Sequence, residues 1–220
     1  MIIIKNLSKS YKTKFSDKMI FDNISFKIRL NESIAVLGKS GSGKSTLLNL
    51  ISGEDNGDKG GVFSNKRISW PIGSKRVFHP LMTIRQNITF ISKLYLGNNK
   101  KAINQKINFV ENFADLDIPL NSQFLKLSNN FKTKIAIALS MAFEFDFYLI
   151  DGLNYGPDPE FKSKSKNFLN DKIKDKSTIM IDKNLRDLEK KCNKAFVINN
   201  KKISIFKNVS EGIAFYKNNL

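Results

Sequence analysis

A glycine-rich segment near residue 40 carries the clearest chemistry in this sequence. Gly38, Gly43, Lys44 and Ser45 match the pattern G-x-x-x-x-G-K-[ST]. The glycines allow backbone N–H groups to face a phosphate, while Lys44 is placed to reach β- and γ-phosphates and Ser45 to hold Mg²⁺. The segment therefore predicts binding of a nucleoside triphosphate. The predicted binding residues are Gly38, Lys39, Ser40, Gly41, Ser42, Gly43, Lys44, Ser45 and Thr46.

The flanking sequence places this segment between a strand and a helix. The apolar run 33–37 predicts a buried strand that leads into the loop, and the apolar run 47–51 predicts a helix that leaves it. The amino end of that helix adds a partial positive charge where the phosphates would lie. This context favours a phosphate-binding loop over an ordinary glycine turn.

Further elements follow from apolar spacing and turn residues. We expect strands at 2–5 and 20–28 around a polar loop, and short strands from the turn at 57–61 to residue 69. Thr83 and Gln86 have capping-box spacing, which predicts a helix to about residue 96. A second helix would align Ile103, Ile107, Val110 and Ala114 on one face.

The last third predicts two buried strands and a hairpin. Residues 147–151 form an apolar strand that ends at Asp151, and residues 178–181 form another, followed by a helix over 185–192. The strands 195–198 and 201–206 would pair across Asn199-Asn200, because asparagine tolerates the positive φ angles of a tight turn.

Size and charge limit the function classes. The chain has 220 residues, enough for one large domain or for a domain with an insertion. Its net charge of +17 suggests nucleic acid, but only five of the 37 basic residues are arginine, so a solvated basic surface is favoured over a specific nucleic-acid partner. Cys192 is the single cysteine, which excludes an internal disulfide and fits a reducing compartment. No apolar run reaches 18 residues.

The order of these motifs resembles the ATPase domains of ABC transporters. The chain has Ser10-Tyr11, then the phosphate loop, a helical stretch, Leu127-Ser128 and a strand that ends at Asp151. Residues 68–73 and 139–151 are similar to the ATP-binding subunits of capsular-polysaccharide exporters of the polysaccharide/polyol phosphate type. The resemblance implies an α/β fold with a P-loop core sheet and an antiparallel β subdomain. A helical subdomain at about 81–143 would be inserted in a single domain, 1–220.

The resemblance also implies roles for residues outside the loop. Tyr11 would stack on adenine, or would be a plain strand-edge aromatic, and Asp151 would hold Mg²⁺ together with Ser45. Asp158 would face a dimer partner, or would cap a helix. The signature residues that reach across such a dimer are Ser128, Asn129 and Asn130.

Several positions depart from the family pattern. Gly152 stands where the family has the glutamate that polarises attacking water, Lys183 replaces a histidine that touches the γ-phosphate, and His79 is aligned with a glutamine. Asn130 replaces a signature glycine. The loss of a general base alone costs roughly 10²–10⁴ in rate, so we expect ATP binding with impaired hydrolysis. Asp182 is a weak candidate for a substitute base.

The function implied is the nucleotide-binding subunit of a polysaccharide exporter. The cofactors would be ATP and Mg²⁺, and the partners an integral membrane permease, docked near 79–86, and a second ATPase copy in a homodimer or heterodimer. The subunit would be cytoplasmic and peripheral at the inner face of the membrane. The alternatives are a slow ATPase, a non-hydrolytic ATP-binding regulator or scaffold without a transport role, and a decaying gene copy.

Overall fold

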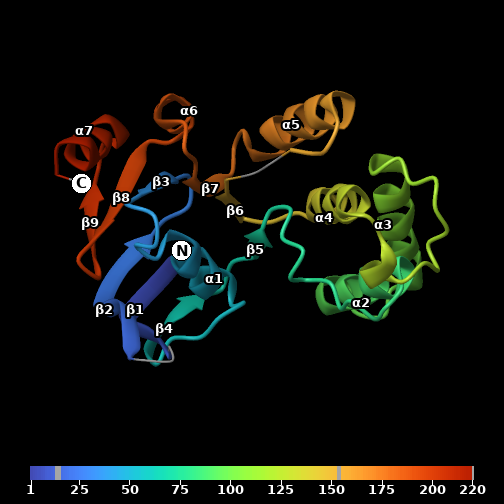
Figure 1. The fold of residues 1–220 in the computed structure, drawn as a ribbon, viewed down its shortest axis with the longest axis horizontal. Helices are drawn as coiled ribbons and strands as arrows, with labels where there is room; N and C mark the ends of the chain where they lie inside the picture. The colour runs from blue at the N-terminus through green and yellow to red at the C-terminus, as the bar shows by residue number, and fades with distance from the viewer. Residues whose placement is uncertain (13–15, 153–154, 220) are drawn as a thin grey trace. The chain divides into compact units, whose positions relative to one another are not determined.

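The computed structural model describes residues 1–12, 16–152 and 155–219. It divides into two compact units. The first unit contains Met1–Pro71, Phe145–Leu153 and Ile173–Leu220, and the second contains Ile72–Glu144 and Asn154–Lys172. Figure 1 shows the course of the chain through its helices and strands.

A six-stranded sheet forms the centre of the first unit. Its order is β5-β6-β7-β3-β8-β9, parallel except for β9, which pairs with β8 in the antiparallel direction. The strands of this sheet are β3 (Ser33–Leu37), β5 (Ile68–Pro71), β6 (Phe147–Asp151), β7 (Ser177–Ile181), β8 (Lys194–Asn199) and β9 (Lys202–Phe206). Because β3, β6 and β7 are parallel, the residues that follow them meet at one edge of the sheet.

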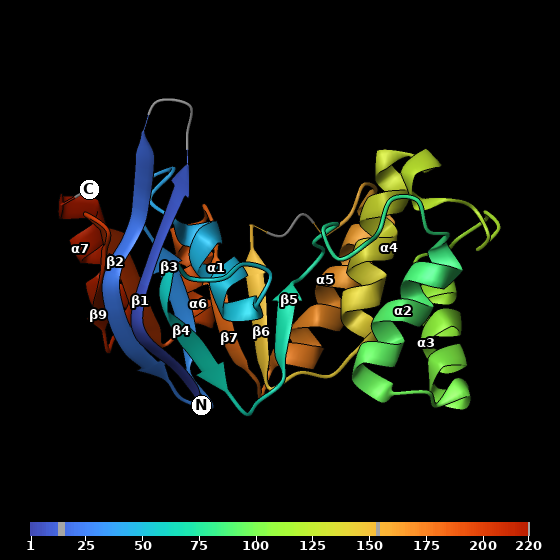
Figure 2. The ribbon, with the colours of Figure 1, turned by 90° about the horizontal axis from the view of Figure 1, so that it is seen from below.

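A second, antiparallel sheet has the order β2-β1-β4. Its strands are β1 (Ile2–Lys12), β2 (Asp17–Ile28) and β4 (Lys59–Ser64), and Figure 2 shows β1 and β2 as a long pair. The expectation of a polar loop between 2–5 and 20–28 was wrong, because both strands continue well into that stretch; residues 13–15 lie outside the described residues. An antiparallel strand with one face in water is polar at every second position, so polarity alone does not distinguish it from a loop.

Both sheets share one apolar core with the helix α1 (Lys44–Ser52). Ile4 and Phe21 from the antiparallel sheet, Leu48 from α1, and Phe147 and Phe196 from the parallel sheet all belong to it. Each of these five side chains is at most 2% exposed. The loop that precedes α1 therefore has a buried strand on one side and a helix anchored in the core on the other.

Two further helices complete the first unit, α6 (Leu185–Lys191) and α7 (Val209–Asn219). The helix α7 was not predicted from the sequence. Gly212 lets α7 approach β8, since a Cβ at this position would lie 2.3 Å from the Cβ of Ala195. Cys192 ends α6 with its thiol buried, and burial raises the pKa of that thiol to about 12.

The hairpin at the sheet edge turns one residue later than expected. Asn199 pairs with Lys202, so the turn residues are Asn200 and Lys201, at φ 46° and 64°. The expected turn, Asn199-Asn200, was therefore wrong by one position. Ile198 lies opposite Ile203 in the ladder. This apolar pair sets the register of the hairpin, and it outweighs the cost of holding Lys201 at a positive φ angle.

The second unit is helical in its described residues. Its elements are α2 (Ile84–Leu96), α3 (Lys100–Phe113), the 3-10 helix η1 (Phe124–Lys126), α4 (Asn129–Ala142) and α5 (Pro159–Ile173). The capping box of Thr83 and Gln86 is present at the start of α2. The unit also contains residues 72–80 and nearly all of α5, which lie outside the range 81–143. The sequence indicated α5 only through Asp158, as the alternative in which that residue caps a helix.

One buried amide holds the chain that enters α2. Asn87 is 1% exposed, and its side chain accepts from the backbone N–H of His79 at 2.7 Å. The same amide donates to the carbonyl oxygens of His79, Met82 and Thr83 at 3.0–3.3 Å. Asn87 therefore holds the loop before α2, together with the backbone hydrogen bonds from Phe124 to Met82 and from Leu125 to Pro80. Across the described chain, none of the helices combines the length and apolarity needed to cross a bilayer.

Candidate functional site

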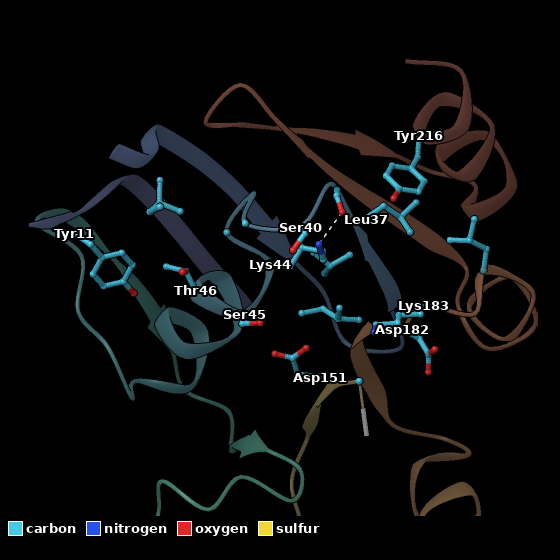
Figure 3. Close-up of a pocket in the computed structure, with 18 of the residues that line it drawn as sticks. Tyr11, Leu37, Ser40, Lys44, Ser45, Thr46, Asp151, Asp182, Lys183 and Tyr216 are labelled. Carbon is cyan, nitrogen blue, oxygen red and sulfur yellow. Dashed lines mark hydrogen bonds between the residues drawn. The ribbon is translucent and has the colours of Figure 1, made fainter. Parts of the chain in front are cut away.

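A cavity of about 780 Å³ lies at the edge where β3, β6 and β7 end (Figure 3). Its volume is within the range of small-molecule sites in proteins. In Figure 3, Tyr11 lies at one end and Lys183 at the other, with Ser45 and Asp151 between them. The sequence-predicted residues that line it are Tyr11, Gly38, Ser40, Gly41, Gly43, Lys44, Ser45, Thr46, Asp151, Gly152 and Lys183.

Two residues of the predicted loop lie elsewhere. Lys39 and Ser42 line a smaller neighbouring cavity of about 150 Å³, together with Lys18 and Lys201. The Ser42 hydroxyl oxygen is buried and has no hydrogen-bond partner among the described residues. Neither residue therefore lines the larger cavity.

The loop geometry requires glycine at two of its fixed positions. Gly38 has φ 154°, and a Cβ there would lie 2.5 Å from the Ser42 hydroxyl and 2.9 Å from the Ile198 carbonyl oxygen. Gly43 has φ 105°, and its Cβ would lie 2.5 Å from the Ile20 side chain. Neither position can accept a larger residue unless these neighbouring atoms move.

Lys44 lies at the start of α1 and folds back over the loop. Its ammonium donates to the carbonyl oxygen of Gly38 at 2.7 Å, the dashed line in Figure 3, and to that of Lys39 at 2.8 Å. Burial lowers the pKa of Lys44, and the charge of Asp151 opposes that shift. The first N–H groups of α1 have no acceptor within the helix, because an α-helix leaves its first turn of donors unpaired.

These groups fit a nucleoside triphosphate with Mg²⁺. The loop donors and Lys44 supply positive charge to phosphate oxygens, and the Ser45 hydroxyl and the Asp151 carboxylate are oxygen ligands of the kind Mg²⁺ prefers. No group of three or more His, Cys, Asp or Glu side chains suited to a metal occurs in the described part of the chain. Mg²⁺ at this site would therefore take its other ligands from phosphate and water, as it commonly does in nucleotide sites.

Tyr11 is on β1 and is held by a residue that the sequence did not reveal. It is 38% exposed and lines the cavity, and its hydroxyl donates to the Asp55 carboxylate at 2.6 Å. Asp55 comes after the end of α1. No motif marks it, because its contact with Tyr11 spans 44 residues of sequence.

The two positions of altered chemistry lie at the same edge of the sheet. Gly152 has φ 52°, its N–H donates to the Ile181 carbonyl oxygen at 2.8 Å, and a Cβ there would meet no atom within 4 Å. Lys183 and Asp182 are exposed and line the cavity. The Asp182 carboxylate accepts from the Asn184 N–H at 2.8 Å. The cavity wall thus has an ammonium at 183 and no side chain at 152.

The signature residues belong to the second unit. Ser128 caps α4, with its hydroxyl accepting from the Phe131 N–H at 3.3 Å. Asn129 accepts from the Lys75 ammonium at 2.6 Å. Ser128, Asn130 and Asp158 line one small cavity of about 270 Å³. The structure therefore brings three of the four predicted dimer-facing residues together.

Asp158 and His79 also lie in the second unit. Asp158 accepts from the Phe161 N–H at 2.8 Å, as an N-cap of α5 does, and pairs with Lys134 at 2.9 Å. The Phe161 N–H and the Lys134 ammonium hold the pKa of Asp158 below its usual value. His79 is exposed, with its backbone held by Asn87.

Comparisons with known proteins agree with this architecture. A family model described as ABC transporter matches residues 21–152. The polysialic acid transport ATP-binding protein KpsT of Escherichia coli is 37% identical over 222 residues, covering 100% of both chains. The capsule polysaccharide export ATP-binding protein CtrD of Neisseria meningitidis serogroup B is 32% identical, covering 98% of each chain.

A solved structure gives the same fold. The ATP-binding cassette MJ0796, in a dimeric post-hydrolysis state bound to ADP and Pi, has a TM-score of 0.71 at 19% identity, covering 95% of this chain and 99% of that one. The expected α/β cassette fold, with an antiparallel β subdomain and a helical region, is confirmed. Because the family model matches more than half of the chain, and relatives above 30% identity match nearly all of it, this chain belongs to the ABC transporter family.

Proposed function

We propose that the chain is the ATP-binding subunit of an ABC exporter for capsular or other surface polysaccharide. The observation that carries this proposal is the full-length match to transport proteins named for polysialic acid and capsule polysaccharide. Residues 1–220 would act as one ATP-binding domain, with the helical subdomain about 81–143 as its insertion. The subunit would work at the inner face of the membrane, attached through an integral permease.

The 780 Å³ cavity is the proposed site for Mg-ATP. The N–H groups at the start of α1 and the Lys44 ammonium bind phosphate oxygens, and Ser45 and Asp151 hold the ion. Bound Mg²⁺ supplies positive charge that offsets the charge of the phosphates. Tyr11 forms the wall against which the adenine base packs.

Hydrolysis at this site is proposed to be slow. Gly152 has no acceptor that could orient water, and Lys183 places an ammonium where the family has a histidine. An ammonium beside the γ-phosphate strengthens ground-state binding without supplying a base, and uniform binding does not raise the chemical rate. We expect turnover at least ~100-fold below that of a relative with the glutamate, because the loss of a general base lowers the rate by roughly 10²–10⁴-fold and 10² is the lower limit.

The proposed assembly is a head-to-tail dimer, with itself or with another ABC ATPase. Ser128, Asn129, Asn130 and Asp158 of one copy would face the phosphate loop of the other. The observation in support is that Ser128, Asn130 and Asp158 share one cavity although Asp158 is far from the other two in sequence. The permease would dock beside 79–86.

Deleting the gene in the source organism tests the transport role. Surface polysaccharide should be lost and polymer should accumulate inside the cells. Re-expression of the wild-type chain should restore export, and Lys44→Ala should not. Unchanged surface polysaccharide in the deletion strain, measured with a polymer stain on intact cells, would remove the transport role and leave a regulator or scaffold.

A further inference from the structure

Two contacts hold the Tyr11 side chain, one at its hydroxyl and one on a face of its ring. The hydroxyl donates to Asp55 Oδ2 at 2.6 Å. The Lys9 ammonium lies 4.9 Å from the ring centroid, over the ring. Because Lys9 covers one face, the opposite face is the one left for a planar ligand in the cavity that Tyr11 lines.

The same lysine fixes the carboxylate that holds Tyr11. Lys9 is 8% exposed, and its ammonium donates to Asp55 Oδ1 at 2.6 Å and to the Asn56 carbonyl oxygen at 2.8 Å. The hydrogen bond to Asp55 raises the pKa of Lys9 against the effect of its burial. Burial opposes ionisation of Asp55, but the hydrogen bonds from Lys9, Tyr11 and Asn56 outweigh it and lower the pKa of Asp55. The pair is therefore ionised across the neutral range.

Asp55 is itself tied to the helix that begins at the phosphate loop. Its backbone N–H donates to the Asn49 carbonyl oxygen at 3.1 Å, within the last turns of α1. A nine-residue helix is about 14 Å long, so α1 sets the distance between the phosphate donors at its start and the carboxylate past its end. The position of the Tyr11 ring is thereby linked to the position of the phosphate loop.

We propose that Asp55, held by Lys9, positions the Tyr11 ring so that one face receives the base of a nucleotide. This inference rests on the proposed function, since it needs the cavity to bind a nucleotide. An exposed tyrosine without this tether would sample several rotamers and would lose that freedom on binding. Lys9 and Asp55 are positioning residues that set the affinity for the base and leave the affinity for the phosphates unchanged.

Calorimetry with two ligands separates these contributions. The ligands are Mg-ATP and Mg-tripolyphosphate, which has the phosphates without a base. Tyr11→Phe keeps the ring and removes the tether, and should weaken Mg-ATP about threefold to tenfold, as for one lost hydrogen bond, with less than about twofold change for tripolyphosphate. Asp55→Ala should act in the same direction in the wild-type chain and add nothing in the Tyr11→Phe background.

Asp58→Asn is the matched control. This substitution removes a negative charge from the same segment. In the wild-type chain the Asp58 carboxylate accepts from the Ser10 N–H at 2.6 Å, and the amide oxygen of the variant can accept the same hydrogen bond. It should leave the affinities for both ligands unchanged. Mg-ATP affinity equal to wild type in Tyr11→Phe, or equal losses for both ligands, would overturn the positioning role. A wild-type chain that binds neither ligand would instead overturn the proposed nucleotide site.

Discussion

At the scale of single residues, the candidate site depends on which acceptors Lys44 can reach. Its ammonium donates to two neutral carbonyl oxygens of its own loop. A phosphate oxygen is a charged acceptor, and charge-assisted hydrogen bonds are roughly twice as strong as neutral ones. Lys39 is the other lysine of the same loop, but it does not line the large cavity, so it provides a comparison for the role of position.

Lys44→Ala should therefore weaken Mg-ATP binding strongly. The loss of a hydrogen bond to a charged group costs about 1.5–3 kcal/mol, or roughly 10- to 150-fold in the dissociation constant. Lys39→Ala removes the same charge from the same loop and should change affinity less than about threefold. Isothermal titration calorimetry measures both. Equal losses in the two variants would show that general positive charge, and not the position of Lys44, binds the ligand.

Gly152→Glu together with Lys183→His should raise ATP turnover. The added carboxylate has open space, but φ 52° at residue 152 makes any side chain cost about 1–2 kcal/mol of stability. Gly152→Ala has the same strain without a carboxylate, so it should lose the same stability in denaturant unfolding and gain no activity. Phosphate release is the measurement for turnover, with Lys44→Ala as the contamination control. A wild-type turnover of about one per second or faster, absent in that control, would contradict a slow site.

At the scale of elements, the first turn of α2 depends on the buried amide of Asn87. Asn87→Ala should destabilise the chain by about 1–3 kcal/mol, because the His79 N–H loses the acceptor that Asn87 supplies, whereas the Met82 carbonyl oxygen still accepts from the Phe124 N–H at 3.0 Å. Asn104, on the exposed side of α3, provides the matched control. Asn104→Ala should be neutral or slightly stabilising, since alanine is the better helix former. Denaturant midpoints compare the two variants, and equal midpoints would contradict the role of Asn87.

The elements that the sequence predicted well are those coded by neighbouring residues. The phosphate loop, the capping box at Thr83 and the strand ending at Asp151 each depend on fewer than ten consecutive positions. Asp55 and Asn87 were missed because their roles arise from the tertiary path of the chain, and no local pattern marks them. The length of β1 was wrong for a related reason, since its polar residues pair with β2 instead of forming a loop.

At the scale of the whole molecule, the net charge of +17 and the family membership bear on membrane attachment. The purified chain should bind vesicles that contain anionic lipid at low salt and should be released by about 0.5 M salt, where the screening length falls to a few ångströms. Vesicles of neutral lipid are the control. Retention of the chain alone at high salt, in a flotation assay, would argue against a permease as its main anchor.

The burial of Cys192 has a consequence for measuring motion. A thiol with a pKa of about 12, closed in at the junction of α6 and β8, reacts with an alkylating reagent only when that junction opens. β8 pairs with β3, the strand that leads into the phosphate loop. A ligand at 100 times its dissociation constant reduces any opening that destroys its site about 100-fold. The alkylation rate of Cys192 should therefore be measured with and without Mg-ATP. An unchanged rate would show that this half of the sheet opens with the nucleotide bound, and a rate about 100-fold lower would show that it opens only after the nucleotide has left.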